Sequence, residues 1–270
     1  MRRFTSPLAR WLSGFIVLSA VGCTPAADRT YKEARSEIER GHFRVGLDLL
    51  IRAAETEKKS ELKFKHYLEA ARIARFEVQD FQRAIRLNKE IILKSPDEKL
   101  RINAQESVAE IYFENLLDYA QALKELQKLE PIVKESEQRE RVTLKICQAL
   151  YLTGDPARAL DEISLALRSA KTEVLSFLKV KAQAQVALKK YEEALATYEH
   201  IFQSNPQYFE KENLFMAVSV VYEEKEDYAA AIKYLNTYGE KINDKAYLEL
   251  RHRRLQERLV NKPLFQGKRK

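Results

Sequence analysis

The chain has 270 residues, of which 45% are hydrophobic and 32% charged, and it contains only seven glycines and seven prolines. So few turn-forming residues exclude a sandwich or barrel with many tight turns, and the normal apolar fraction excludes wholesale disorder. The net charge of +7 comes from the two ends: residues 1–22 contribute +3, residues 251–270 contribute +7, and the rest carries −3. Because the body is mildly acidic, we expect no nucleic-acid-binding function.

Residues 1–22 have the pattern of a signal peptide. Residues 1–10 contain three arginines and no acidic residue, and the next twelve residues are uncharged. An uncharged run of that length is too short to cross about 30 Å of hydrocarbon as a helix, but it suits the core of a signal peptide. The sequence therefore predicts a secretory signal over residues 1–22.

The signal ends in Leu18-Ser-Ala-Val-Gly-Cys23, which resembles the lipobox of bacterial lipoproteins. The resemblance implies cleavage before Cys23, lipid attachment to it, and a lipidated linker over residues 23–30. Several acyl chains anchor a protein stably, whereas one binds only marginally. Thr24 stands where an aspartate often signals inner-membrane retention, so the resemblance favours the outer membrane of the bacterial envelope, facing the periplasm. An ordinary secretory signal with an incidental cysteine is the alternative.

The body of the chain is repetitive. Six segments share an apolar ring, two spacers, a small residue and an aliphatic residue, and the small residues stand at steps of 38, 38, 37, 35 and 37. The small residues are Gly46, Ala84, Ala122, Ala159, Ala194 and Ala231. The ring positions are Phe43, Phe81, Tyr119, Pro156, Tyr191 and Tyr228. Four of the ring positions follow an aspartate, as expected of a helix N-cap, and Gly41 and Gly154 stand two residues before a ring position, where a tight turn favours glycine.

These columns resemble the tetratricopeptide (TPR) repeat, a helix–turn–helix unit of about 34 residues. The resemblance implies an all-α solenoid of about six repeats over residues 31–242. A small residue on the second helix lets the two helices pack closely, and each hairpin must stack on the next to bury its apolar face. Gly46 in place of alanine, Pro156 in place of a ring, and the longer units are departures from the pattern.

A last segment, residues 243–260, is predicted to form a capping helix. Tyr247, Leu248, Leu255 and Leu259 share one stripe in that segment, and Asn261 is expected to end the helix. Residues 261–270 form a basic tail. The tail is either a solvated end or a contact for an acidic surface such as anionic lipid, cell-wall polymer or a partner protein.

No motif indicates catalysis. The sequence has no glycine-rich phosphate loop, nucleophile elbow or His-Glu-x-x-His helix. The four histidines are far apart, and Cys147 occupies a small-residue position where we expect a buried, unreactive thiol. We therefore expect no enzyme, no metal and no cofactor.

The resemblance places the binding surface on the concave side of the solenoid, lined by first-helix residues that do not pack. Transferring the repeat spacing to the second unit selects Lys65, Leu68, Arg72, Arg75 and Phe76. Later units add Phe113, Arg141 and Tyr151 as partner-binding candidates. Arginines beside rings suit an extended peptide or a carboxylate. If Arg72 and Arg75 are exposed, reversing both charges is expected to leave the fold intact. The alternative to a binding surface is that the rings belong to the core and the charged residues only keep the helix face soluble.

The sequence therefore predicts a membrane-anchored TPR scaffold or adaptor that binds envelope proteins or peptides in its groove. Two families share this layout of lipobox and TPR array: the TPR lipoprotein of the outer-membrane β-barrel assembly machine, and the pilotin lipoprotein of type IV pilus secretins. The residues do not choose between them. Alternatives are a cell-wall-binding module that uses the basic tail, and an adaptor of a periplasmic protease.

Overall fold

The computed structural model describes residues 26–242 and 244–261. Within those residues every regular element is a helix, and none of the helices is long and apolar enough to cross a membrane. The predicted signal peptide, Cys23, and residues 262–270 of the basic tail lie outside the described residues.

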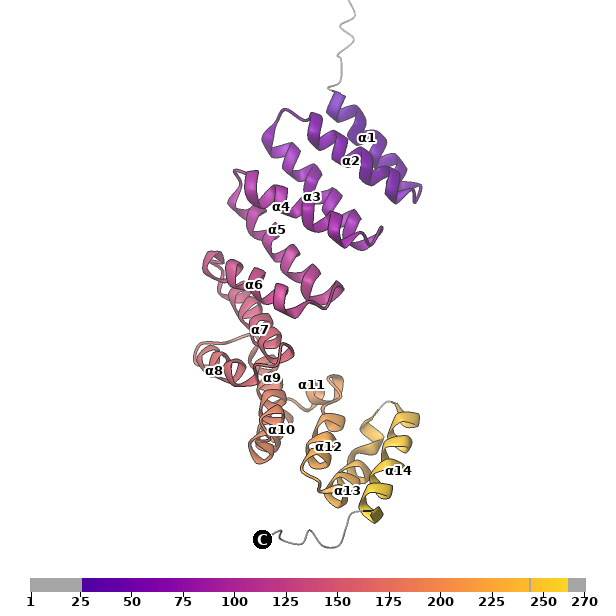
Figure 1. Ribbon diagram of the computed structural model, residues 1–270, viewed down its shortest axis with the longest axis vertical. Helices are drawn as coiled ribbons and strands as arrows, with labels where there is room; N and C mark the ends of the chain where they lie inside the picture. The colour runs from indigo at the N-terminus through magenta and orange to yellow at the C-terminus, as the bar shows by residue number, and fades with distance from the viewer. Residues whose placement is uncertain (1–25, 243, 262–270) are drawn as a thin grey trace, which may run out of the picture.

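The described helices form six consecutive hairpins and one terminal helix, arranged as an elongated array that runs from α1 to α14 (Figure 1). The first helices of the hairpins are α1 (Ala26–Glu39), α3 (Ser60–Phe76), α5 (Glu98–Glu110), α7 (Ser136–Leu152), α9 (Val174–Ala187) and α12 (Leu214–Glu224). The second helices are α2 (Phe43–Thr56), α4 (Phe81–Lys94), α6 (Tyr119–Leu129), α8 (Pro156–Ala166), α10 (Tyr191–Ser204) and α13 (Tyr228–Tyr238). The predicted all-α solenoid of six repeats is confirmed.

Each second helix begins at the predicted ring position, and in four of the six the side chain of the residue before it caps the helix. The side chain of Asp80 accepts a hydrogen bond from the Arg83 amide at 2.9 Å. Three further aspartates do the same at the start of their helices, namely Asp118, Asp155 and Asp227. These bonds satisfy amides that an uncapped helix leaves unpaired.

The turn inside every hairpin contains one residue with a left-handed backbone, always two positions before the second helix. Glycine holds this position in two hairpins, with φ of 81° at Gly41 and 86° at Gly154. In the other four, φ lies between 53° and 59°, and the residues are Gln79, Leu117, Lys189 and Glu226. A residue with a Cβ is strained there, so four of the six turns store conformational strain.

The small-residue column is buried between paired helices, as predicted. The five alanines of the column are fully buried. At Gly46 a Cβ would lie 2.5 Å from Ile38 Cγ1, so α1 and α2 approach too closely for alanine. This contact explains why the first repeat departs from the pattern.

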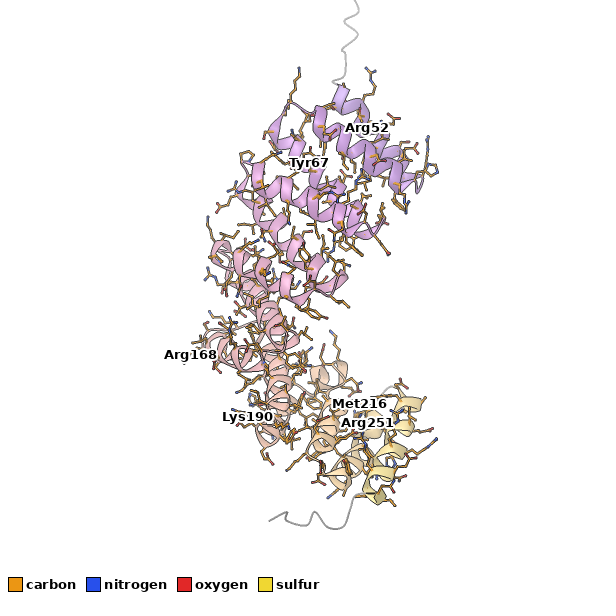
Figure 2. All side chains as sticks on the ribbon, in the orientation of Figure 1. Arg52, Tyr67, Arg168, Lys190, Met216 and Arg251 are labelled. Carbon is orange, nitrogen blue, oxygen red and sulfur yellow. The ribbon has the colours of Figure 1, made fainter. Side chains whose placement is uncertain are left out.

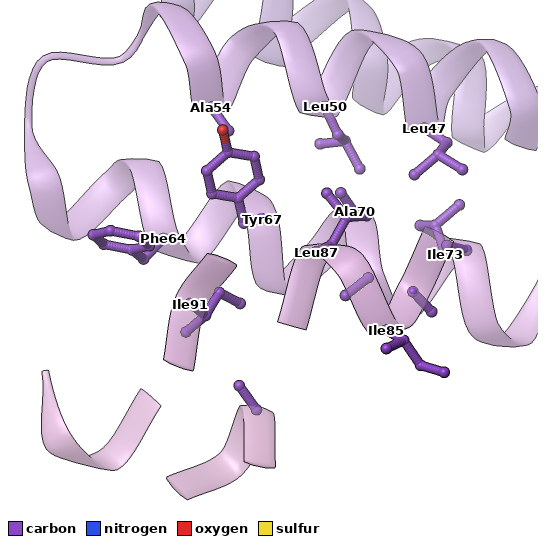
Figure 3. Packing of buried hydrophobic residues seen from close by; sticks show 14 of the residues in the cluster. Leu47, Leu50, Ala54, Phe64, Tyr67, Ala70, Ile73, Ile85, Leu87 and Ile91 are labelled. Carbon is purple, nitrogen blue, oxygen red and sulfur yellow. The ribbon is translucent and has the colours of Figure 1, made fainter. Parts of the chain in front are cut away.

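The hydrophobic core continues from each hairpin into the next. Figure 3 shows Leu47 and Leu50 of α2 above Ala70 and Ile73 of α3, with α4 packed below. Further clusters continue the core through α9 to the terminal helix α14 (Lys245–Asn261). A lone hairpin cannot bury such faces, which is why the array forms.

The structure differs from the prediction in four details. Helix α1 begins at Ala26, inside the expected linker, and Ala27 in its first turn is buried. A short helix, α11 (Pro206–Lys211), is inserted before α12. A π-helix, η1 (Ile111–Asn115), ends the first helix of the third hairpin. Two 3₁₀ turns, η2 (Glu130–Ile132) and η3 (Gly239–Lys241), follow α6 and α13.

The packed face of α14 also differs from the predicted stripe. Leu255 is buried and Leu248 packs against the last hairpin, but Tyr247 and Leu259 are more than 40% exposed. Arg251, labelled in Figure 2, completes the packed face by donating to Ser219 Oγ and pairing with Glu223. The prediction placed only apolar residues on the packed face of this helix, so it did not include Arg251.

Candidate functional site

The first helices together form one surface of the array, which we call the first-helix face. A hollow of about 580 Å³ opens on it between α1, α3 and α5. All five residues predicted for the second unit line this hollow: Lys65, Leu68, Arg72, Arg75 and Phe76. The other lining residues are Arg35, Glu69, Ala71, Asn88, Asn103 and Ser107. We call it the basic hollow, because four of its lining side chains are cationic and one is acidic.

Arg72 is the one arginine of the basic hollow that has no ionic partner among the described residues. It is exposed on α3. Arg35 pairs with Glu69 at 2.8 Å, and Lys65 pairs with Glu61 at 2.6 Å. The N–H donors of the Arg72 guanidinium are therefore available to bind a ligand.

Arg75 is not an exposed groove residue, so that expectation is wrong. Its side chain is 6% exposed. The guanidinium donates to Asn115 Oδ1 at 2.9 Å, to Glu110 at 2.8 Å and to Glu114 at 2.9 Å. It also lies 4.7 Å from the centre of the Phe76 ring, which is 57% exposed at the edge of the hollow. Arg75 fixes one wall of the hollow and joins α3 to the next repeat.

The Arg75 cluster extends to a third repeat. Lys145 of α7 donates to Glu110 at 3.0 Å and to Glu114 at 3.1 Å. Burial raises the pKa of Glu110, but the hydrogen bonds and charges of Arg75 and Lys145 outweigh it and lower the pKa below its ordinary value. Glu110 thus stays ionised, and the ion pairs of Glu110 and Glu114 tie three neighbouring first helices together.

The π-helix η1 explains how three side chains meet on one guanidinium. In a π-helix the hydrogen bonds run from residue i to i+5, so residues five apart lie one turn apart. Glu110 and Asn115 are five apart, and Glu114 lies beside them. The sequence pattern gave no signal of this wider turn.

Asn88 is a second feature of the basic hollow that sequence reasoning missed. It lies on α4 and is fully buried, and it lines the hollow from below. Its Nδ2 donates to the Ala84 carbonyl at 3.0 Å and to Ser107 Oγ at 3.2 Å, whereas Oδ1 has no hydrogen-bond partner. A buried acceptor without a hydrogen-bond partner costs folding free energy. Asn88 therefore gives the basic hollow a polar group that is free to accept a hydrogen bond.

A second hollow, of about 410 Å³, opens farther along the first-helix face. Helices α7, α9, α10 and α12 enclose it, and Tyr151 is the predicted site residue among its lining residues. The remaining lining residues are Gln183, Val186, Ala187, Lys189, Tyr191, Tyr198, Ala217, Val220 and Glu224. We call it the tyrosine hollow.

Two predicted site residues line neither hollow. Phe113 is half-buried in the core and packs edge-on against Tyr119, with ring centres 5.3 Å apart. Arg141 is exposed on α7 and pairs with Glu137 at 3.0 Å. The structure therefore brings Arg72, Arg75 and Phe76 together and places Tyr151 in a different hollow.

The described residues hold no group of three or more His, Cys, Asp or Glu side chains able to bind a metal ion. Cys147 is fully buried, and burial raises the pKa of its thiol to about 12. A thiol with so high a pKa is unreactive at neutral pH.

Comparisons with known proteins identify the fold. No protein-family model and no curated protein matches the sequence. A tetratricopeptide repeat protein from Parabacteroides merdae is similar in structure, with a TM-score of 0.64 and 14% identity over 86% of this chain and 88% of that one. The C-terminal part of a TPR repeat-containing protein from Cytophaga hutchinsonii has a TM-score of 0.55 and 15% identity, over 90% of this chain and 86% of that one.

A third structure, YrrB, is described as a TPR protein with an unusual peptide-binding site. It has a TM-score of 0.52 and 16% identity, over 70% of this chain and 91% of that one. At these identities the comparisons show the fold alone. The chain has the fold of a TPR solenoid.

Proposed function

We propose that this TPR solenoid is a non-enzymatic scaffold that binds an extended segment of a partner protein along the first-helix face. The observation that carries the proposal is the basic hollow, in which an unpaired Arg72 stands beside the exposed ring of Phe76. Its volume lies within the range of about 300–1,000 Å³ that is typical of ligand sites.

The chemistry of the basic hollow fits a carboxylate on the partner. A planar guanidinium binds a carboxylate through two parallel hydrogen bonds, and Arg72 has all its donors available. Asn103 and Ser107 line the opposite wall and supply neutral polar groups for a peptide backbone. The charge of Arg75 is balanced by Glu110 and Glu114, so Arg75 positions the wall of the hollow.

The location of the scaffold rests on the lipobox-like sequence. Acylation of Cys23 would hold the protein at the outer membrane of a bacterial envelope, facing the periplasm. A groove beside that membrane suits an adaptor in envelope assembly, such as outer-membrane protein or pilus secretin assembly. The peptide-binding site in the description of YrrB supports the general idea that a solenoid of this fold binds peptides.

A crosslinking pull-down from envelope membranes tests the proposal. Arg72→Glu should reduce recovery of the partner, whereas Arg141→Glu should not, because Arg141 lines neither hollow. Both positions are exposed on first helices, so the two variants match in charge change and in expected stability. Equal recovery by two folded variants would exclude Arg72 from the binding site.

A further inference from the structure

A third hollow, of about 270 Å³, is formed by side chains of α10, α11, α12 and α13. These helices lie toward the C-terminal end of the array (Figure 1). We call it the aromatic hollow, because six of its ten lining residues are tyrosine or phenylalanine. The lining residues are Leu195, Ala196, Tyr198, Glu199, Phe202, Phe209, Val218, Tyr222, Tyr234 and Tyr238.

Four partly exposed rings form a continuous wall of the aromatic hollow. The centre of the Tyr234 ring lies 5.9 Å from that of Tyr222 and 4.7 Å from that of Tyr238. Tyr238 in turn lies 6.2 Å from Phe202. Phe209 of the inserted helix α11 packs edge-on against Phe202 at 5.3 Å and supports the wall from behind. The rings contact one another without a ligand, so the wall is preformed.

Glu199 is the one charged residue that lines the aromatic hollow. It is exposed on α10, and it forms no ion pair with the described residues. Its Oε1 accepts a hydrogen bond from Gln203 Nε2 at 2.8 Å, whereas Oε2 has no such partner among those residues. Burial, the neighbouring Tyr238 and Tyr222, and the charge of Glu199 raise the pKa of Tyr234. The carboxylate therefore lies within electrostatic reach of the aromatic wall.

The polar groups of the aromatic hollow select a cation. Each phenol hydroxyl can both donate and accept a hydrogen bond, whereas the Glu199 carboxylate can only accept. None of the ten lining residues is cationic or has a side-chain N–H group. The faces of aromatic rings carry negative potential and attract positive charge. The complementary group is therefore a cation that donates hydrogen bonds.

The size of the aromatic hollow and the single free oxygen favour a lysine side chain. The volume lies below the range of about 300–1,000 Å³ that is typical of small-molecule sites, so it suits one side chain. Leu195, Ala196 and Val218 offer apolar contacts for the carbon stem of a lysine. Because Glu199 Oε1 already accepts from Gln203, the carboxylate suits a compact ammonium better than an arginine fork, which pairs with both oxygens.

We propose that the aromatic hollow binds a lysine side chain of a partner protein, whose ammonium contacts the tyrosine faces and the Glu199 carboxylate. The inference goes beyond the proposed function, because the aromatic hollow prefers the opposite charge to the basic hollow. It also lies on a different surface, since two of its helices, α10 and α13, are second helices. The chain would thus have one site for an acidic group and another for a basic group.

The test titrates the full chain, solubilised in detergent, into a dye-labelled nonapeptide and follows fluorescence anisotropy. The peptide alternates glycine and serine, has blocked ends and carries one central lysine. The comparison peptides have norleucine, which keeps the carbon stem without the ammonium, or arginine at the central position. The lysine peptide should bind saturably, at least about tenfold more tightly than the norleucine peptide and more tightly than the arginine peptide.

Glu199→Gln tests the carboxylate. It keeps the size of the side chain and removes its charge, and it should raise the Kd of the lysine peptide about tenfold. Glu193→Gln is the matched control, because it makes the same charge change at an exposed position of the same helix that does not line the aromatic hollow. It loses only a surface ion pair with Lys190 at 3.7 Å and should leave the Kd unchanged.

Tyr222 tests the aromatic wall, because it stands at the end of the wall and its loss disturbs the other rings least. Tyr222→Phe keeps the ring and should leave the Kd nearly unchanged. Tyr222→Leu removes the ring face and should raise the Kd about two- to fivefold, as expected for one exposed cation–π contact. A circular-dichroism melt verifies that each variant is folded.

Any of four results would overturn the inference: no saturable binding of the lysine peptide, equal binding of the norleucine or arginine peptide, equal effects of Glu199→Gln and Glu193→Gln, or unchanged binding by Tyr222→Leu. Arg72→Glu should not weaken binding of the lysine peptide, since Arg72 lies in the basic hollow. Failure of the lysine site leaves partner crosslinking through Arg72 intact, and failure of the basic hollow leaves lysine binding intact. The two proposals therefore fail separately.

Discussion

Arg75 Nη1 donates to Glu110 Oε2 at 2.8 Å, although the two residues belong to different repeats and are 35 positions apart. The bond joins α3 to α5, and Lys145 extends the cluster to α7. A buried guanidinium that binds three side chains stabilises the array itself. Its neighbour Arg72, three positions earlier, contributes an open donor set to the surface.

We expect Arg75→Ala to lower the free energy of unfolding by about 1–3 kcal/mol, because it strands a partly buried carboxylate pair. The loss should be smaller than for a fully buried ion pair, because Glu114 is nearly half exposed and solvent screens its charge. Arg72→Ala should stay within about 0.5 kcal/mol of the original chain, as exposed substitutions usually do. Urea midpoints measure both changes, and equal shifts would refute the stabilising role of Arg75.

The left-handed turn position predicts a pair of opposite effects. Leu117→Gly should raise the free energy of unfolding by about 0.5–1 kcal/mol, because glycine adopts φ of 53° without a Cβ clash. Leu117 is 60% exposed, so little packing is lost. Gly154→Ala should lower stability by about 1 kcal/mol, since its φ is 86° and nothing else lies near the added Cβ. Thermal melts in which both changes act in the same direction would contradict this explanation.

His66 predicts a pH dependence of stability. Its ring stacks on Tyr31 with centres 4.5 Å apart, and its buried Nδ1 has no hydrogen-bond partner. Burial lowers the pKa of His66 below its ordinary value, although the charges of Glu57 and Glu69 partly oppose the shift. The unfolded chain therefore binds this proton more readily, and stability is lost as pH falls from about 6.5 through the lower folded-state pKa.

His66→Phe keeps a ring against Tyr31 and removes the titrating group. The variant should lose less stability than the original chain between pH 7 and pH 5, as measured by urea unfolding at each pH. His42→Phe is the control, because His42 is exposed and pairs with Glu37 at 2.7 Å. If His66→Phe and the original chain lose the same stability, burial of His66 does not cause the dependence.

The lipid anchor is tested by Cys23→Ser. The change should abolish acylation, and the protein should then remain an uncleaved precursor or be released from the membrane. Intact-mass spectrometry of the membrane and soluble fractions distinguishes these species. A normally processed Cys23→Ser protein with unchanged membrane partition would contradict acylation at this residue.

The sequence predicted the repeats well because their determinants are local. A ring and a small residue at the fourth helical position recur in most second helices, and an aspartate cap marks the start of four of them, among them Asp80 and Asp118. The turn chemistry was recognised only where glycine marks it. At Leu117 the residue type gives no sign of a left-handed backbone, because the flanking helices impose it.

The candidate site was predicted in part. The repeat spacing correctly placed Arg72 and Phe76 in the lining of the basic hollow. It did not show that Arg75 forms ion pairs with carboxylates of the next repeat. That arrangement depends on the π-turn at Ile111–Asn115. The tyrosine hollow was missed except for Tyr151, since α7, α9, α10 and α12 form it together and no single repeat contains its pattern.

The proposed binding of a partner carboxylate by Arg72 is tested most directly by a reciprocal charge exchange. Once crosslinking has identified the segment, its affinity is measured for the original chain, for Arg72→Glu, and for Arg72→Glu against a segment whose acidic residue is changed to lysine. We expect Arg72→Glu to weaken binding at least tenfold and the lysine segment to restore most of it. An affinity that Arg72→Glu leaves unchanged, in a chain that melts as the original does, would contradict the claim.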